Sequence, residues 1–145
     1  MNNEVTILIT EDDEGHAMLI QKNLRRAGIS NSFRHFRDGQ EVLDFLFGRS
    51  DESLEDGRSY LLLLDIRMPR VDGIEVLRQI KSQESLRRMP VIMITTTDDP
   101  QEVNQCHALG CNNYITKPVD YNRFIEAIRQ LGLFFSIVEI PSLPK

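Results

Sequence analysis

The chain has 145 residues, a formal net charge of −5 and 41% hydrophobic residues, which predicts one soluble domain with its own core. The acidic balance and the lack of a basic run argue against nucleic-acid binding, which needs clustered Lys and Arg. No apolar stretch has the length of a membrane span and the N-terminus has no signal-peptide pattern, so we expect a cytoplasmic protein with reduced cysteines.

The first half of the chain alternates short apolar runs with helical patterns. The four leucines at 61–64 show no polar alternation, which is typical of a strand covered on both faces. Residues 32–37 alternate apolar and polar side chains, which predicts an edge strand. The predicted elements are strand 5–10, helix 14–27, strand 32–37, a helix from 38 to 48, a polar loop at 48–59 and strand 61–64.

The second half continues the same alternation. An Asp that can serve as the N-cap stands at the start of each predicted helix, and a Gly follows most of these helices. The predicted caps are Asp13, Asp38, Asp72, Asp98 or Asp99, and Asp120, and the predicted stops are Gly28, Gly48, Gly110 and Gly132. The predicted elements are helix 72–83, strand 91–94, a helix from 98 or 99 to 110, strand 113–116 and a helix from 120 to 132.

Five strands that alternate with five helices predict an α/β fold with a doubly wound parallel sheet and helices on both faces. We expect one domain over residues 1–132 and an apolar extension over 133–145. An exposed apolar segment of this kind usually marks an interface. The extension either folds back on its own domain or docks on a second copy of the chain. We expect the second, a homodimer through the fourth helix, the fifth strand, the fifth helix and the extension.

Polar groups follow four of the five predicted strands. Glu11, Asp12 and Asp13 follow the first strand, and Asp65 follows the third. The fourth strand ends in Thr95 and the fifth is followed by Lys117. In a parallel sheet these ends share one edge, where ligands bind. Several carboxylates with no Cys or His beside them favour Mg²⁺, and carboxylates, Mg²⁺ and Lys suit phosphoryl transfer to Asp65.

These residues resemble the receiver domain of two-component response regulators over about residues 4–132. The resemblance rests on a set of short motifs in a fixed order. They are Glu11-Asp12, Asp65 with Met68-Pro69 and Asp72-Gly73, Thr95, Tyr114, and Lys117-Pro118. The loop at 48–59, the pair Thr95-Thr96 and the extension are similar to small single-domain regulators paired with phytochrome-type histidine kinases.

The resemblance implies a flavodoxin-like sheet with strand order 2-1-3-4-5. It also implies that Asp65 accepts a phosphoryl group from a sensor histidine kinase. The phosphorylated protein would then signal through a change of shape and through protein contacts. The protein would then be a phosphoacceptor rather than an enzyme. The implied Mg²⁺ ligands are Asp12, Asp65 and the backbone carbonyl of Arg67, with Glu11 acting indirectly.

Further roles follow from the same resemblance. Lys117 would contact the phosphoryl oxygens, Thr95 would bond one of them, and Tyr114 would turn inward as part of the switch. The peptide between Lys117 and Pro118 would be cis.

Some residues depart from the common pattern of the family. Thr96 stands where a small residue is frequent, and its bulk would narrow access to the phosphoryl group. Arg67 and Thr97, two residues after Asp65 and Thr95, fall at positions that resemble tuners of dephosphorylation. We hypothesise that Arg67 shields the acyl phosphate and lengthens its life. No chemistry is assigned to His16, His35 or His107.

The main alternative is a haloacid-dehalogenase-like phosphatase, which also uses a strand-end Asp, Mg²⁺, Thr and Lys. That class needs an acid two residues after the nucleophile, and Arg67 occupies this place. A flavodoxin-like nucleotide binder would need a Gly-rich or Ser/Thr-rich loop after the first strand, where this chain has acids. A third alternative is a receiver that acts as a scaffold without being phosphorylated.

Overall fold

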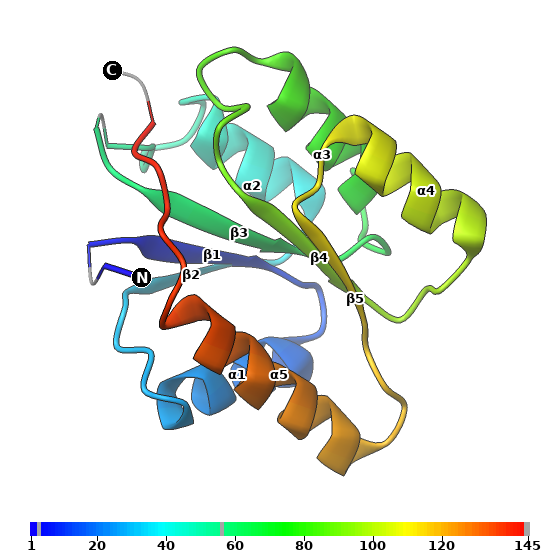
Figure 1. Ribbon diagram of the computed structural model, residues 1–145. Coiled ribbons are helices and arrows are strands. Elements are labelled where there is room, and N and C mark those ends of the chain that lie inside the picture. Colours follow the sequence, from blue (N-terminus) through cyan, green and yellow to red (C-terminus); the bar gives the residue numbers. More distant parts are fainter. Residues whose placement is uncertain (3, 56, 144–145) are drawn as a thin grey trace.

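The computed structural model describes residues 1–2, 4–55 and 57–143. Its five parallel strands form one sheet in the order β2-β1-β3-β4-β5, which confirms the expected topology (Figure 1). The strands are β1 (Thr6–Thr10), β2 (Phe33–Phe36), β3 (Tyr60–Leu64), β4 (Val91–Thr95) and β5 (Asn113–Thr116). The helices are α1 (Glu14–Arg26), α2 (Gly39–Leu46), α3 (Gly73–Ser82), α4 (Pro100–Leu109) and α5 (Tyr121–Phe135).

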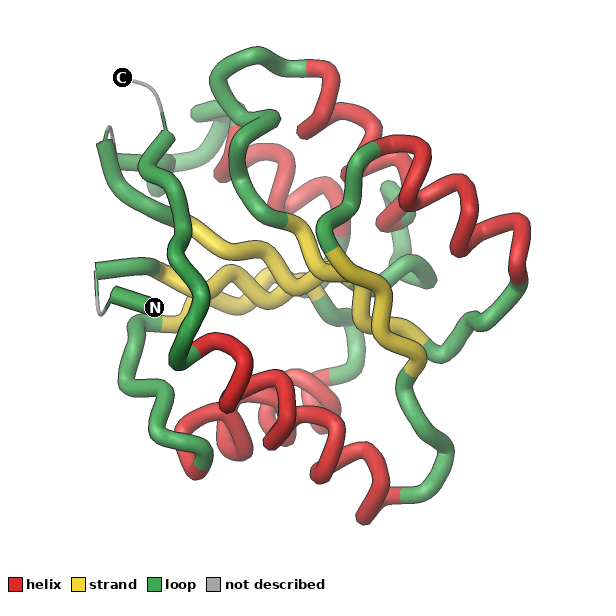
Figure 2. The backbone as a smooth tube through the Cα atoms, viewed as in Figure 1, coloured by secondary structure: helices red, strands yellow, loops and turns green. Residues whose placement is uncertain are grey.

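The three central strands β1, β3 and β4 are buried along their whole length, and the edge strands β2 and β5 are only partly buried. Helices α1 and α5 cover one face of the sheet, and α2, α3 and α4 cover the other (Figures 1 and 2). Each face has its own apolar cluster. The uninterrupted leucines at 61–64 follow from this double cover, since β3 has no face toward water.

Carboxylate caps start the helices as the sequence predicted. The side chain of Asp38 accepts a hydrogen bond from the Glu41 N–H at 2.9 Å, and Asp72 accepts one from Glu75 N–H at 2.9 Å. Asp13, Asp99 and Asp120 cap the remaining helices in the same way. Gly110 ends α4 with φ 103°, a left-handed conformation that favours glycine.

The predicted stop of the last helix at Gly132 is wrong, because α5 continues to Phe135. Gly132 serves instead as a point of close helix packing. A Cβ atom at this position would lie 2.6 Å from the Cβ of Ala27, which follows α1. The residue is therefore small because α5 lies against the end of α1, and Phe135 is fully buried one turn later.

The segment after α5 runs back over the amino ends of the strands (Figure 1). Val138 and Ile140 pack against the cluster under α1 and α5, whereas Leu143 is buried in the cluster under α2, α3 and α4. The Leu143 N–H also donates to the Arg58 carbonyl at 3.2 Å. Much of the extension thus packs on its own domain, and residues 144–145 lie outside the described part of the chain.

An exposed apolar surface remains at the end of α5. Leu133, Phe134 and Ile137 are 52%, 44% and 77% exposed.

Within the described residues, no helix combines the length and the apolar character that crossing a membrane requires.

The contact between Gly73 and the strand end gives a first testable expectation. A Cβ atom added at Gly73 would overlap the backbone carbonyl oxygen of Asp65, and backbone cannot move aside as a flexible side chain can. We expect Gly73→Ala to lower the free energy of unfolding by about 1–3 kcal/mol or more, measured by urea denaturation.

Gly15→Ala is the matched control for that measurement. A Cβ atom at Gly15 would meet only the flexible Asp13 carboxylate, at 3.1 Å, and alanine is favoured over glycine in a helix. This variant should be as stable as the wild type or more so. Equal unfolding midpoints for Gly73→Ala and the wild type would contradict the close approach.

Candidate functional site

The carboxyl ends of the strands bring the predicted polar residues together. Thr10 is paired with Leu64 in the parallel register of β1 and β3, so the next residues along the chain, Glu11 and Asp65, are neighbours. The Asp65 N–H donates to the Thr10 carbonyl at 3.1 Å. Backbone hydrogen bonds thus place the two carboxylate residues side by side independently of their side-chain contacts.

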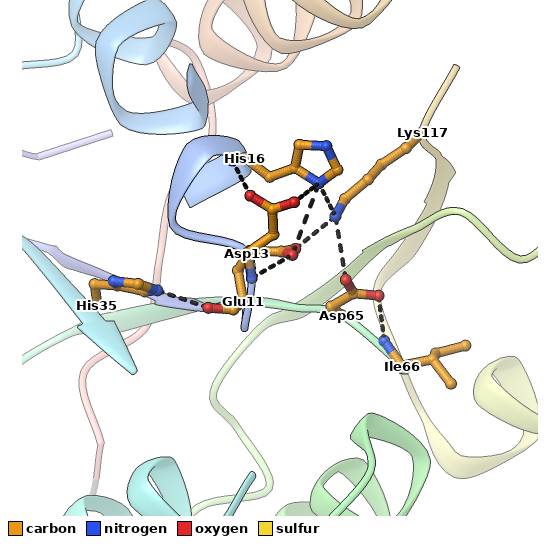
Figure 3. A network of polar contacts seen from close by, with 7 residues as sticks. All are labelled: Glu11, Asp13, His16, His35, Asp65, Ile66 and Lys117. Carbon is orange, nitrogen blue, oxygen red and sulfur yellow. Dashed lines mark hydrogen bonds and ion pairs between the residues drawn. The ribbon is translucent and has the colours of Figure 1, made fainter. Parts of the chain in front are cut away.

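The ammonium group of Lys117 lies at the centre of the site (Figure 3). Its Nζ atom is 2.5 Å from Glu11 Oε2 and 3.1 Å from Asp65 Oδ2. The Lys117 N–H donates to the Thr95 carbonyl at 2.6 Å, which fixes the start of its side chain beside the end of β4. All three charged side chains are buried, so their interaction is weakly screened by water.

Three carboxylates are suitably placed for a divalent cation. Glu11, Asp12 and Asp65 each offer one oxygen, and these oxygens lie within 4.8 Å of one another. Asp12 is exposed at the mouth of the site, whereas Glu11 and Asp65 are buried. An all-oxygen donor set of this kind suits Mg²⁺ or a similar hard cation.

The two buried carboxylates differ in their acidity. Burial raises the pKa of Glu11 to about 7, although the positive charge of Lys117 acts in the opposite direction. Burial also tends to raise the pKa of Asp65, but hydrogen bonding with Glu11 and the charge of Lys117 outweigh it and lower this pKa below its ordinary value. Asp65 is therefore the more readily ionised member of the pair. Its Oδ1 atom accepts from the Ile66 N–H at 2.7 Å.

Thr95 lies at the end of β4 and is fully buried. Its hydroxyl oxygen has no hydrogen-bond partner among the described residues. The Thr95 side chain nevertheless lies near enough to Asp65 to help lower the pKa of that carboxyl, so its hydroxyl is placed to donate to an oxygen beside Asp65. Thr96, whose bulk the sequence analysis noted, is exposed.

Two histidines contribute to the site, although the sequence pattern gave them no role. His16 Nδ1 lies 3.4 Å from Lys117 Nζ and 3.8 Å from Glu11 Oε1 (Figure 3). His35, from the edge strand β2, places Nε2 2.7 Å from the backbone oxygen of Glu11. The available signal for His16 was its place three residues after the cap Asp13, which turns it back over the acids in the first turn of α1.

The predicted switch residue Tyr114 is half-buried, and its hydroxyl donates to the Thr97 carbonyl at 2.7 Å. Burial raises the pKa of this hydroxyl to about 12. The Thr97 hydroxyl donates to Glu102 at 2.6 Å, and Arg67 donates to the same carboxylate at 2.8 Å. Glu102, which was not predicted as a site residue, thus bonds both Arg67 and Thr97, and Tyr114 is connected to it through Thr97.

The expected cis peptide between Lys117 and Pro118 is wrong, because all described peptide bonds are trans. The trans form is the intrinsically favoured one, even before proline. With this trans bond, the Lys117 backbone still bonds Thr95 and its ammonium still reaches both carboxylates.

Several known proteins are similar to this chain in sequence. The family model for the response regulator receiver domain matches residues 7–129. The probable methanogenesis regulatory protein FilR2 of Methanothrix harundinacea is 39% identical over 132 residues, covering 88% of this chain and 83% of FilR2. Response regulator Rcp1 of Synechocystis is 31% identical over 138 residues, covering 95% of this chain and 92% of Rcp1.

Solved structures match over nearly the whole chain. A receiver domain from Rhodospirillum rubrum is 48% identical with a TM-score of 0.91, covering 97% of this chain and 99% of that domain. The Mn²⁺-bound form of Rcp1 is 29% identical with a TM-score of 0.87, covering 94% of this chain and 98% of Rcp1.

The phosphorylated cyanobacterial phytochrome response regulator RcpA is also similar. It is 29% identical with a TM-score of 0.86, and the match covers 94% of this chain and 98% of RcpA. The fold, the strand-end residues and these matches agree, and the chain belongs to the family of response regulator receiver domains, with regulators of the phytochrome type among its relatives.

Proposed function

We propose that this receiver acts as a single-domain response regulator that accepts a phosphoryl group on Asp65 from a sensor histidine kinase. The observation that carries the proposal is the convergence of Lys117 on the carboxylates of Asp65 and Glu11 at the ends of three strands. The low pKa of Asp65 keeps its carboxylate ionised, and an ionised carboxylate is a competent nucleophile toward phosphorus.

The transfer itself needs one displacement. An Asp65 carboxylate oxygen forms a bond to phosphorus while the bond from phosphorus to the imidazole nitrogen of the donor breaks. The electron pair of that bond stays on the donor imidazole, which takes up a proton. Lys117 and the hydroxyl of Thr95 stabilise the charge on the transferred oxygens.

Mg²⁺ fits this site through Asp12, Asp65 and the backbone carbonyl of Arg67, with Glu11 acting indirectly. The three-carboxylate cluster supports this assignment, as does the Mn²⁺-bound form of the relative Rcp1. A divalent cation would supply the positive charge that the transferring phosphoryl oxygens require.

We propose that the kinase partner is of the phytochrome type, as the likeness to RcpA suggests, and that this protein meets it in the cytoplasm. Met18 on α1 and Val119 before α5 are apolar and highly exposed. Met18 lies two residues after His16, and Val119 lies two residues after Lys117. Both are therefore available for contact with the domain that carries the phosphoryl donor.

The phosphatase alternative shares Asp65, Thr95 and Lys117 with the receiver but lacks a general acid. Its general acid would stand at position 67, where this chain has Arg67 instead of a carboxylic acid. The guanidinium of Arg67 is also bonded to Glu102. A phosphoacceptor with slow self-dephosphorylation is therefore the better account than an enzyme acting on free phosphomonoesters.

We propose that the output is a change of shape together with contacts on the α4, β5 and α5 face, including a homodimer. On α4 only Cys106 is buried, so this helix has few contacts to lose. Apolar side chains at the end of α5 are exposed, namely Leu133, Phe134 and Ile137. The later part of the extension packs on its own domain, so the interface would use the helix end.

The phosphoacceptor is tested by labelling with a small acyl-phosphate donor and Mg²⁺. Mass spectrometry should detect one added phosphoryl group on the wild type and none on Asp65→Asn, and a chelator should abolish labelling. Asp13→Asn is the control, because asparagine also caps helices, and it should label as the wild type does. Labelling of Asp65→Asn would refute the assignment.

The proposed shield is tested by the lifetime of the acyl phosphate after the donor is removed. Arg67→Ala should shorten this lifetime, because a guanidinium beside the phosphoryl group stabilises its charge and limits the approach of water. Mass spectrometry over time measures the decay. A lifetime equal to that of the wild type would contradict the shielding role.

The dimer is tested by replacing exposed rather than buried residues, because cutting the chain after Gly132 would also remove the buried Phe135. The double variant Phe134→Ser, Ile137→Ser should sediment as a monomer at concentrations where the wild type is a dimer. Met18→Ser, an exposed apolar residue on α1, should keep the mass of the wild type. A dimeric double variant would count against this interface.

A further inference from the structure

Glu102, in the first turn of α4, connects two loops that leave neighbouring strands. Its Oε1 atom accepts from Arg67 Nη2 at 2.8 Å, and its Oε2 atom accepts from Thr97 Oγ1 at 2.6 Å. Arg67 lies two residues beyond Asp65 on the loop after β3, and Thr97 lies two residues beyond Thr95 on the loop after β4. Both oxygens of one carboxylate are therefore occupied across the mouth of the site.

The two partners differ in exposure. The Arg67 side chain is 65% exposed, and that of Glu102 is 17% exposed. The guanidinium is thus held at the surface by a carboxylate that is fixed by its helix and by Thr97. An ion pair whose arginine is mostly exposed to water is weakened by screening, so a more strongly charged anion nearby can displace Glu102 from this arginine.

A phosphoryl group on Asp65 is such an anion. It carries more negative charge than a carboxylate, and a guanidinium bonds phosphate oxygens in a two-pronged geometry. Arg67 is only two residues from Asp65 and lies on the same loop after β3. Its side chain can bond either Glu102 or the phosphoryl group, and each bond is formed at the expense of the other.

We propose that Glu102 is a positioning residue that competes with the phosphoryl group on Asp65 for the guanidinium of Arg67. This inference rests on the proposed phosphoacceptor role of Asp65. The ion pair stabilises the unphosphorylated form, and a contact made only in that form opposes the other form by the same free energy. Glu102 therefore affects how readily Asp65 takes up a phosphoryl group and how long Arg67 shields that group from water.

The same residue connects the site with the switch surface. The Thr97 carbonyl accepts the hydroxyl of Tyr114 on β5, and Glu102 holds the hydroxyl of Thr97. Replacing Glu102 by Gln keeps an oxygen that can accept from Thr97 but removes the charge that attracts Arg67. Glu102→Gln consequently separates the competition for Arg67 from the support of the Thr97 loop.

The test uses the whole chain saturated with Mg²⁺ and titrated with beryllofluoride, which stands in for the phosphoryl group. Binding is followed by amide NMR shifts. Glu102→Gln should bind beryllofluoride about two- to fivefold more tightly than the wild type, the factor that an exposed ion pair contributes. It should also lengthen the life of the acyl phosphate. In the Arg67→Ala background, Glu102→Gln should change neither quantity.

Glu75→Gln is the matched control, because Glu75 is the first-turn glutamate of α3 and also bonds an arginine, Arg78, and an uncharged donor, Gln79. It should bind beryllofluoride as the wild type does. If Glu102→Gln behaves like Glu75→Gln, or keeps its effect without Arg67, the inference is wrong while the phosphoacceptor role stands. If the wild type binds no beryllofluoride, the proposed function fails and this inference fails with it.

Discussion

The contact of one buried ammonium group with two buried carboxylates is the constraint on which the rest of the site depends. Lys117 touches Glu11 and Asp65 together, and one positive charge cannot compensate two negative ones. The balance is reached unequally, since the pKa of Glu11 rises to about 7 while that of Asp65 falls. Removing one partner of a buried pair costs about 3–5 kcal/mol. The same arrangement keeps Asp65 ionised and gathers carboxylate oxygens that suit a hard cation.

The parts of the molecule that hold the site differ from the parts that respond to it. Asp65 and Thr95 follow or end strands that are buried on both faces, and backbone bonds fix their neighbours. Arg67, Thr97 and Tyr114 instead lie on two loops and on the edge strand β5. Elements with few buried contacts open at lower cost than core strands, so the two loops and β5 can change conformation while the central strands stay in place.

The extension links the two layers of the fold while leaving an apolar surface free. Its residues reach the clusters on both faces of the sheet, and α5 runs three residues further than Gly132 before the chain turns back. The end of that helix lies near the start of β5, since Phe134 and Phe135 line a pocket together with Asn113. This explains how one segment can be both a part of the domain and a surface for contact.

The sequence by itself determined the order of strands and helices and the capping residues, because apolar runs and caps are local patterns. It also identified the polar residues at the strand ends, namely Glu11, Asp12, Asp65, Thr95 and Lys117. It also allowed the family to be recognised. It did not reveal His16 or Glu102, and it was wrong about the end of α5 and the Lys117 peptide. These features depend on which side chains meet across loops and between helices. Residues 35 positions apart, such as Arg67 and Glu102, become partners only when the sheet brings their loops together, so tertiary structure alone decided them.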